Sequence, residues 1–129
     1  MSEDQRWRPL IGEDEIPEGG FAFAYQAGPF TETGILLRTA EGVRAWRNLC
    51  RHLSVPLDHA DQGRFLTSDR RHLVCSQHGA LYRPEDGLCV AGPCRGVTLR
   101  PLQIAVRQGW VCLDTSSLPD PLAGFGTTP

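Results

Sequence analysis

Glycine and proline interrupt this chain so often that no stretch keeps a helical period of 3.6 residues for three turns without one of them. The 14 glycines and 10 prolines make 24 of the 129 residues, against roughly 12% for the two types together in an average protein. Such a chain is rich in turns and poor in long helices. Its length suits one domain and excludes a β/α barrel of about 250 residues.

Short strand-like segments alternate with turn signals along the chain. Residues 21–25 alternate aromatic and small side chains at period 2, which is typical of a half-buried strand. Further segments form hairpins across Gly-containing or polar turns. The predicted hairpins pair 34–39 with 43–47, 64–67 with 72–74, 80–83 with 88–90, and 102–106 with 110–113. This pattern predicts an antiparallel all-β domain.

Several side chains outside the turns have predictable surroundings. We expect Trp46 and Trp110 in the core of the sheets, with Trp7 at the edge of the core. Cys112 lies in an apolar strand-like run, so it is also expected in the core. Residues 115–129 carry three prolines and two glycines and are expected to form an extended C-terminal tail.

The charge balance limits the partners of the chain. Thirteen basic residues, all of them Arg, stand against 15 acidic ones, so the net charge of −2 gives no electrostatic footprint for nucleic acid. No apolar run approaches the roughly 20 residues that span a bilayer, and the acidic start is unlike a signal peptide. The sequence therefore predicts a cytoplasmic protein that binds neither nucleic acid nor membrane.

Five cysteines are notable in such a compartment, where thiols stay reduced and clustered cysteines more often mark metal or redox chemistry than disulfides. Cys89 and Cys94 lie five residues apart, and we expect packed thiols there rather than a disulfide or a redox switch. Of the histidines, His59 and His72 are expected at the surface rather than as metal ligands.

Two short boxes each combine a cysteine and a histidine. The first is Cys50-Arg51-His52, and the second is Cys75-Ser76-Gln77-His78, followed by Gly79. Both follow predicted strands, so two loops at one end of a sheet can bring two thiolates and two imidazoles together. Zinc accepts this donor set, but its usual spacing places both Cys in one box and both His in the other. Mixed boxes suit two metals, as in a Rieske [2Fe–2S] centre.

From about residue 44 to residue 113 the sequence resembles the Rieske iron–sulfur family. The resemblance rests on the two boxes and on the downstream Tyr82, Gly87-x-Cys89 and Gly92-Pro93, which is similar to the proline loop of the family. It implies a Rieske-type fold of stacked antiparallel sheets with a cluster-binding loop subdomain. The implied domain covers residues 1–114, with loops at about 50–61, 75–83 and 91–96, before the tail at 115–129.

The resemblance also implies one [2Fe–2S] cluster per chain and a role for each ligand. Cys50 and Cys75 would bind the buried iron, His52 and His78 the outer iron through Nδ1, and the Tyr82 hydroxyl would reach a ligand thiolate. Two Fe³⁺, two S²⁻ and two thiolates sum to zero with neutral imidazoles. Such a cluster is easier to reduce than a four-thiolate one, with potentials of roughly −150 to +300 mV against about −400 mV.

Departures at three positions place the chain within the family. High-potential respiratory members carry an extra Cys in each box, joined by a disulfide, where this chain has Val55 and Gln77. They also carry a Ser that donates to a cluster sulfide, and the matching residue here is Ala80. The chain thus resembles the small soluble ferredoxin-type, non-respiratory members. We expect a low-to-intermediate potential, slightly raised by Tyr82.

The resemblance implies a Rieske-type ferredoxin that carries single electrons between a reductase and an oxygenase or other terminal oxidoreductase, and that is not itself an enzyme. Oxygenase subunits of the family continue into a larger domain with a mononuclear iron site, whereas only a short tail without His follows Leu113. Two alternatives remain open. One is a small redox subunit of a fixed complex, similar to the small subunit of a nitrite reductase, and the other is a structural zinc-binding module.

Overall fold

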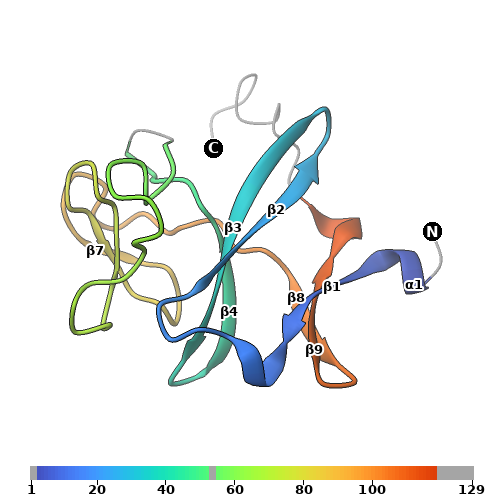
Figure 1. Ribbon diagram of the computed structural model, residues 1–129. Coiled ribbons are helices and arrows are strands. Elements are labelled where there is room, and N and C mark those ends of the chain that lie inside the picture. Colours follow the sequence, from blue (N-terminus) through green and yellow to red (C-terminus); the bar gives the residue numbers. More distant parts are fainter. Residues whose placement is uncertain (1–2, 53–54, 119–129) are drawn as a thin grey trace.

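The computed structural model describes residues 3–52 and 55–118, which form three antiparallel sheets of three strands each (Figure 1). In their order within the sheets, the strands are β2 (Phe21–Ala27), β3 (Phe30–Thr39) and β4 (Gly42–Arg47); β1 (Trp7–Gly12), β9 (Trp110–Asp114) and β8 (Ile104–Arg107); and β5 (Leu73–Val74), β6 (Leu81–Tyr82) and β7 (Cys89–Ala91). Short helical segments are α1 (Glu3–Arg6), η1 (Glu13–Glu15) and η2 (Thr115–Ser117). The predicted all-β class is confirmed.

The central sheet, β2–β3–β4, separates two hydrophobic cores. Figure 1 shows it in the middle, with β1, β8 and β9 on one side and β7 with its surrounding loops on the other. Leu36 of β3 belongs to the core shared with β9, which we call the sheet core, whereas Ile35 and Leu37 belong to the core under the loops, which we call the loop core. Side chains of a strand alternate between its two faces, so one strand supplies both cores.

The predicted strand at 21–25 and the hairpin of 34–39 with 43–47 are confirmed within this sheet. β3 begins earlier than predicted, at Phe30, because it also pairs along its first half with β2. Its Gly34 is required by packing, since a Cβ atom there would lie 2.5 Å from Cζ of Phe23. Trp46 of β4 is buried as expected, and its indole Nε1 donates to the Pro84 carbonyl at 3.1 Å.

The sheet β1–β9–β8 joins the two ends of the described chain. Its β8–β9 hairpin was predicted, and the turn contains Gln108 and Gly109 at positive φ, as a tight hairpin requires. Strand β1 was missed, because Pro9 interrupts its pattern and shifts its register against β9. An edge strand tolerates a proline, whose missing N–H faces away from the ladder.

The prediction that Trp110 lies in the core of the sheets is wrong. Its side chain is 50% exposed rather than in the core. Trp110 is the first residue of β9, directly after the turn, and it lies opposite Arg107 at the end of the sheet. The next four side chains of β9 are buried, and they include Cys112, as expected.

The third sheet consists of short strands within the loops. The predicted pairing of 80–83 with 88–90 is confirmed as β6–β7. The predicted pairing of 64–67 with 72–74 is reduced to one bridge, between Leu66 and Leu73, with no strand assigned to 64–67. Backbone hydrogen bonds flank the bridge, since the Thr67 amide donates to the His72 carbonyl and the Val74 amide donates to the Phe65 carbonyl, each at 2.9 Å. The pairing stays short between the exposed residues 61–64 and 68–71.

The two ends of the described chain lie together. The guanidinium of Arg6 donates to both carboxylate oxygens of Asp114, at 3.1 and 3.0 Å. Asp114 also caps η2 by accepting from the Ser116 amide at 3.0 Å. The predicted tail therefore starts with a short helical turn, and residues 119–129 lie outside the described part of the chain. No helix within the described residues is long and apolar enough to cross a membrane.

Candidate metal centre

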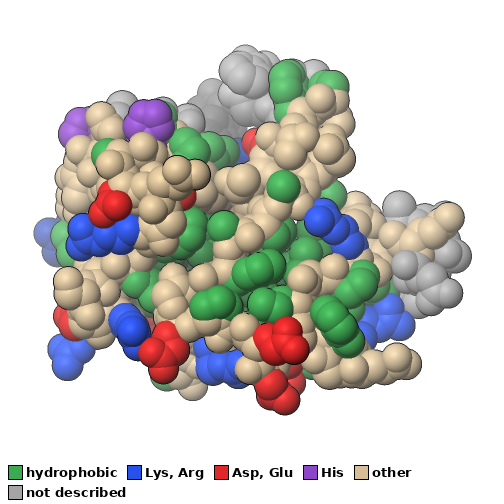
Figure 2. Space-filling view, in the orientation of Figure 1, with side chains coloured by type: hydrophobic (Ala, Val, Ile, Leu, Met, Phe, Trp, Pro, Cys, Tyr) green, Lys and Arg blue, Asp and Glu red, His purple; other side chains and the backbone are tan. Residues whose placement is uncertain are grey.

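The four predicted ligand residues meet at the loop end of the molecule. Cys50 and Cys75 are 2% and 0% exposed and belong to the loop core. His52 and His78 are exposed, and their ring centroids lie 5.1 Å apart. Exposed histidine side chains are visible over these loops in Figure 2. The two boxes thus form a buried thiol pair beneath an exposed imidazole pair.

Two backbone amides of the second box act on the sulfur of Cys75. Burial raises the pKa of the Cys75 thiol overall, and the neighbouring Cys50 thiol adds to this, whereas the Gln77 and His78 amides lower it. Amides that donate to sulfur stabilise the charged thiolate, which is the form that binds metal. The two amides of the second box therefore offset part of the cost that burial places on the thiolate.

The first ligand loop is held by Asn48, which is 4% exposed. Its Oδ1 accepts from the Leu57 amide at 2.8 Å, and its Nδ2 donates to Thr33 Oγ1 and Asp58 Oδ1 at 3.2 and 3.1 Å. The Cys50 amide then donates to the Val55 carbonyl at 2.7 Å. Asn48 thus ties the start and the return of this loop to strand β3.

The second ligand loop closes as a tight turn. The Cys75 amide donates to the Ala80 carbonyl at 2.9 Å, and the Gly79 amide donates to the Cys75 carbonyl at 2.8 Å. Gly79 has a φ of 73°, a conformation that glycine adopts without steric cost. The glycine after the second box therefore serves the turn that presents His78.

Ser76 joins the two ligand loops. Its amide and its hydroxyl both donate to the Leu57 carbonyl, each at 2.8 Å, and its Oγ accepts from the Ala60 amide at 2.9 Å. Sequence reasoning missed Ser76 and Asn48, although both stand within or beside a box. Their partners lie up to 19 residues away, so local spacing carries no signal for these contacts.

Tyr82 lies beneath the first box. Its hydroxyl is 3.4 Å from Cys50 Sγ and 3.0 Å from Cys94 Sγ, and it accepts from the Arg51 amide at 3.1 Å. Burial, followed by the hydrogen bonds with the two thiols, raises the pKa of Tyr82 well above its usual value. The hydroxyl therefore stays protonated and can donate.

The glycine–proline loop packs against the second box. Gly92 has a φ of 101°, and a Cβ atom there would lie 2.8 Å from Cα of Ala80. Ala80 is fully buried and carries no hydroxyl at this contact. Beyond the loop, Cys94 is buried with its Sγ 3.3 Å from that of Cys89. None of the five cysteines, all of which are described, is in a disulfide.

The residues present fit a [2Fe–2S] cluster. They offer two thiols and two imidazoles, the donor set of a Rieske centre. Within residues 3–52 and 55–118, no group of three or more His, Cys, Asp or Glu is placed to hold a single metal ion. A two-iron cluster needs only two protein ligands at each iron, and the structure supplies two such pairs. His59 is exposed, as expected, and His72 is partly buried beside β5.

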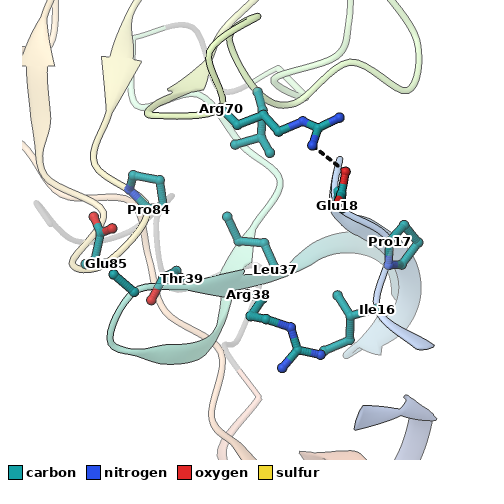
Figure 3. A pocket seen from close by; sticks show the side chains of 11 residues that line it. Ile16, Pro17, Glu18, Leu37, Arg38, Thr39, Arg70, Pro84 and Glu85 are labelled. Atoms are coloured by element: carbon teal, nitrogen blue, oxygen red, sulfur yellow. Dashed lines mark hydrogen bonds and ion pairs between the residues drawn. The ribbon is translucent and has the colours of Figure 1, made fainter. Parts of the chain in front are cut away.

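A cavity of about 300 Å³ lies away from this centre. Its lining includes Ile16, Leu37 and Pro84, and Figure 3 shows Arg70 paired with Glu18 across its rim. Its described lining contains no residue of either Cys–His box. The cavity is therefore separate from the candidate centre.

Comparison with known families identifies the kind of domain that contains the two Cys–His boxes. The family model for the Rieske [2Fe-2S] domain matches residues 6–106. The chain belongs to this family. No curated protein sequence matches the Rieske chain.

Solved structures share the Rieske fold. One from "Complex of reduced oxygenase and oxidized ferredoxin in carbazole 1,9a-dioxygenase" has a TM-score of 0.63 and 19% identity, covering 85% of this chain and 94% of that one. Another, "The reduced complex between oxygenase and ferredoxin in carbazole 1,9a-dioxygenase", has a TM-score of 0.63 and 22% identity, over 92% and 30%. The terminal oxygenase from Nocardioides aromaticivorans IC177 has a TM-score of 0.61 and 25% identity, over 84% and 29%. This chain thus spans about 30% of several of the chains that it matches.

Proposed function

We propose that this Rieske chain is a one-electron carrier whose single [2Fe–2S] cluster is held by Cys50, His52, Cys75 and His78. The observation that carries the proposal is the meeting of a buried thiol pair and an exposed imidazole pair on two joined loops of a Rieske domain. When bound, the cluster supplies a centre that takes up and releases one electron at a time.

The cysteine end of the site is buried, and the histidine end is exposed. Cys50 and Cys75 lie among Leu57 and Phe65, which are 0% and 4% exposed, so water is kept from the thiolate end. His52 and His78 lie at the surface, where a redox partner can approach the imidazole edges. This polarity suits an electron carrier, because the electron enters and leaves through the exposed end.

The surroundings of the sulfur atoms favour a low-to-intermediate reduction potential. Tyr82 can donate to Cys50 Sγ, which stabilises the more negative reduced state and raises the potential. Ala80 offers no hydroxyl to a cluster sulfide, which lowers it. A midpoint potential above about +150 mV, well inside the upper Rieske range, contradicts this part of the proposal.

A reductase as electron donor and an oxygenase or other terminal oxidoreductase as acceptor complete the proposed system, so the chain itself turns over no organic substrate. The support is the fold shared with chains from complexes of an oxygenase and a ferredoxin. The free thiols of Cys75, Cys89 and Cys94 suit a reducing compartment such as the cytoplasm. Within the proposed domain, residues 1–114, the ligand loops cover about 50–61, 75–83 and 91–96.

Metal and sulfide analysis after anaerobic expression tests this function. We expect two iron atoms and two acid-labile sulfides per chain, a red-brown colour, and a reduced-state paramagnetic signal. Zinc without sulfide overturns the proposal in favour of a structural zinc module. Purification only together with a large subunit favours a redox subunit of a fixed complex over a mobile carrier.

A further inference from the structure

Cys94 is a buried thiol that the ligand set does not use. It is 7% exposed, and its Sγ lies 3.0 Å from the Tyr82 hydroxyl. The same hydroxyl lies 3.4 Å from Cys50 Sγ. Cys94, Tyr82 and Cys50 therefore form a continuous chain of polar contacts that ends on a proposed ligand sulfur.

The available protons determine which atom donates and which accepts in the contacts of Cys94, Tyr82 and Cys50. The Tyr82 oxygen already accepts from the Arg51 amide, which can only donate. Cys50, as a ligand, is a thiolate without a proton, so the single Tyr82 proton must point to it. The Tyr82 oxygen then has one lone pair left for Cys94, and only the Cys94 S–H can supply the proton for that contact.

Cys89 supports the same direction. Its thiol donates to the Ala91 carbonyl at 3.2 Å, so the Cys89 proton is already committed. The Cys94 thiol then lies within donor distance of two acceptors, the Tyr82 oxygen at 3.0 Å and the Cys89 sulfur at 3.3 Å. Oxygen is the nearer and the stronger acceptor, since sulfur accepts only weakly.

We propose that Cys94 is a positioning residue for the cluster, which raises its reduction potential by donating to Tyr82 and so strengthening the Tyr82 hydrogen bond to Cys50. This inference rests on the proposed function and deepens it. A hydroxyl that accepts two hydrogen bonds is a more polarised donor, because hydrogen bonds in a chain reinforce one another in a buried site. A stronger bond to the ligand thiolate favours the reduced, more negative cluster.

The test measures the midpoint potential of the cluster in a double-mutant cycle of Cys94 and Tyr82. We expect Cys94→Ala to lower the potential, and Tyr82→Phe to lower it more. In the Tyr82→Phe background, Cys94→Ala should produce no further shift, because no hydroxyl remains to carry its effect. The matched control is Cys112→Ala, a buried thiol on β9 whose sulfur contacts the Trp110 carbonyl, and it should leave the potential unchanged.

Cys94→Ser provides a second test in case the Cys94→Ala variant loses its cluster. A serine hydroxyl is a stronger donor than a thiol, so this variant should match or exceed the wild-type potential, with no such effect in the Tyr82→Phe background. A lowered potential in Cys94→Ser overturns the inference, as does an equal shift from Cys94→Ala in both backgrounds or none in either. Iron and sulfide analysis of the wild type separates the two proposals: a protein without a cluster overturns both, and an intact cluster without coupling overturns this one alone.

Discussion

The central sheet has two neighbours of different construction. On one side, the sheet core is enclosed by β2, β3 and β4, which have 7, 10 and 6 residues, together with β1, β8 and β9. On the other, the ligand-loop region, residues 48–52 and 55–99, contains strands of 2, 2 and 3 residues. Regular ladders hold the first region. Tight turns and individual side-chain hydrogen bonds hold the second, which suits a region that is completed by a bound cluster.

This difference predicts that overall stability and cluster retention can be changed separately by substitution. The sheet core buries its apolar side chains without any residue of the Cys–His boxes. The loop core includes the two proposed ligand cysteines themselves. Loss of the cluster should therefore loosen the loop region first, and changes in the sheet core should lower overall stability with little specific effect on the cluster.

The largest expected effect comes from removing one ligand thiolate in the ligand-loop region. Cys50→Ser or Cys75→Ser should give colourless protein of lowered thermal stability, because metal binding is coupled to the folding of the loops. Far-ultraviolet circular dichroism should still report the strands of the central sheet. His59→Ala, at an exposed site in the first loop, is the control that keeps the visible spectrum. A native-like cluster spectrum in either cysteine variant means that the ligand assignment is wrong.

Two neighbouring leucines of β3 probe the two cores directly. Leu36→Ala opens space in the sheet core and Leu37→Ala in the loop core, and each should cost about 2–5 kcal/mol of unfolding free energy. Because Leu37 lies on the loop side, we expect only Leu37→Ala to hasten the loss of visible absorption in the presence of an iron chelator. Equal rates of cluster loss in the two variants mean that the cores are not independent.

The link between the ligand loops gives a smaller effect. Ser76→Ala removes both hydroxyl contacts, to Leu57 and Ala60, and keeps the Ser76 amide bond, at a cost of about 1–3 kcal/mol. We expect faster cluster loss in chelator. The matched control is Ser116→Ala, whose hydroxyl bonds Asp114 beside the sheet core, and its cluster should be lost at the wild-type rate. Unchanged cluster loss in Ser76→Ala means that Ser76 does not secure the loops.

The smallest expected effect concerns acid stability at the chain ends. Hydrogen bonds from the Arg6 guanidinium and from Ser116 hold the pKa of Asp114 well below its usual value. The ionised carboxylate therefore stabilises the fold above the unfolded-state pKa of about 4, and this contribution is lost as the pH falls through the lower folded-state pKa. Asp114→Asn should lower the urea midpoint at pH 7 and reduce its further fall towards pH 3. An acid dependence equal to that of the wild type contradicts this role.

Local patterns accounted for much of the fold and for the composition of the site. Alternation at 21–25 and the turns near Gly42 and Gly109 predicted the strands and hairpins that the structure contains. The spacing of the two boxes indicated Cys50, His52, Cys75 and His78, and the structure brings the imidazoles together over the buried thiols. These features depend on residues that are close in sequence, where backbone geometry and side-chain chemistry act directly.

Long-range packing decided the rest. The sequence alone determined an antiparallel, turn-rich domain with two Cys–His boxes. Only the tertiary structure determined that Trp110 is exposed to solvent, that β1 pairs with β9 and that Ser76 bonds Leu57. The same holds for Cys94, which meets Cys50 through Tyr82, a residue 32 positions from Cys50. Such contacts depend on how three sheets stack, and the energy of that packing is shared among residues that no local pattern connects.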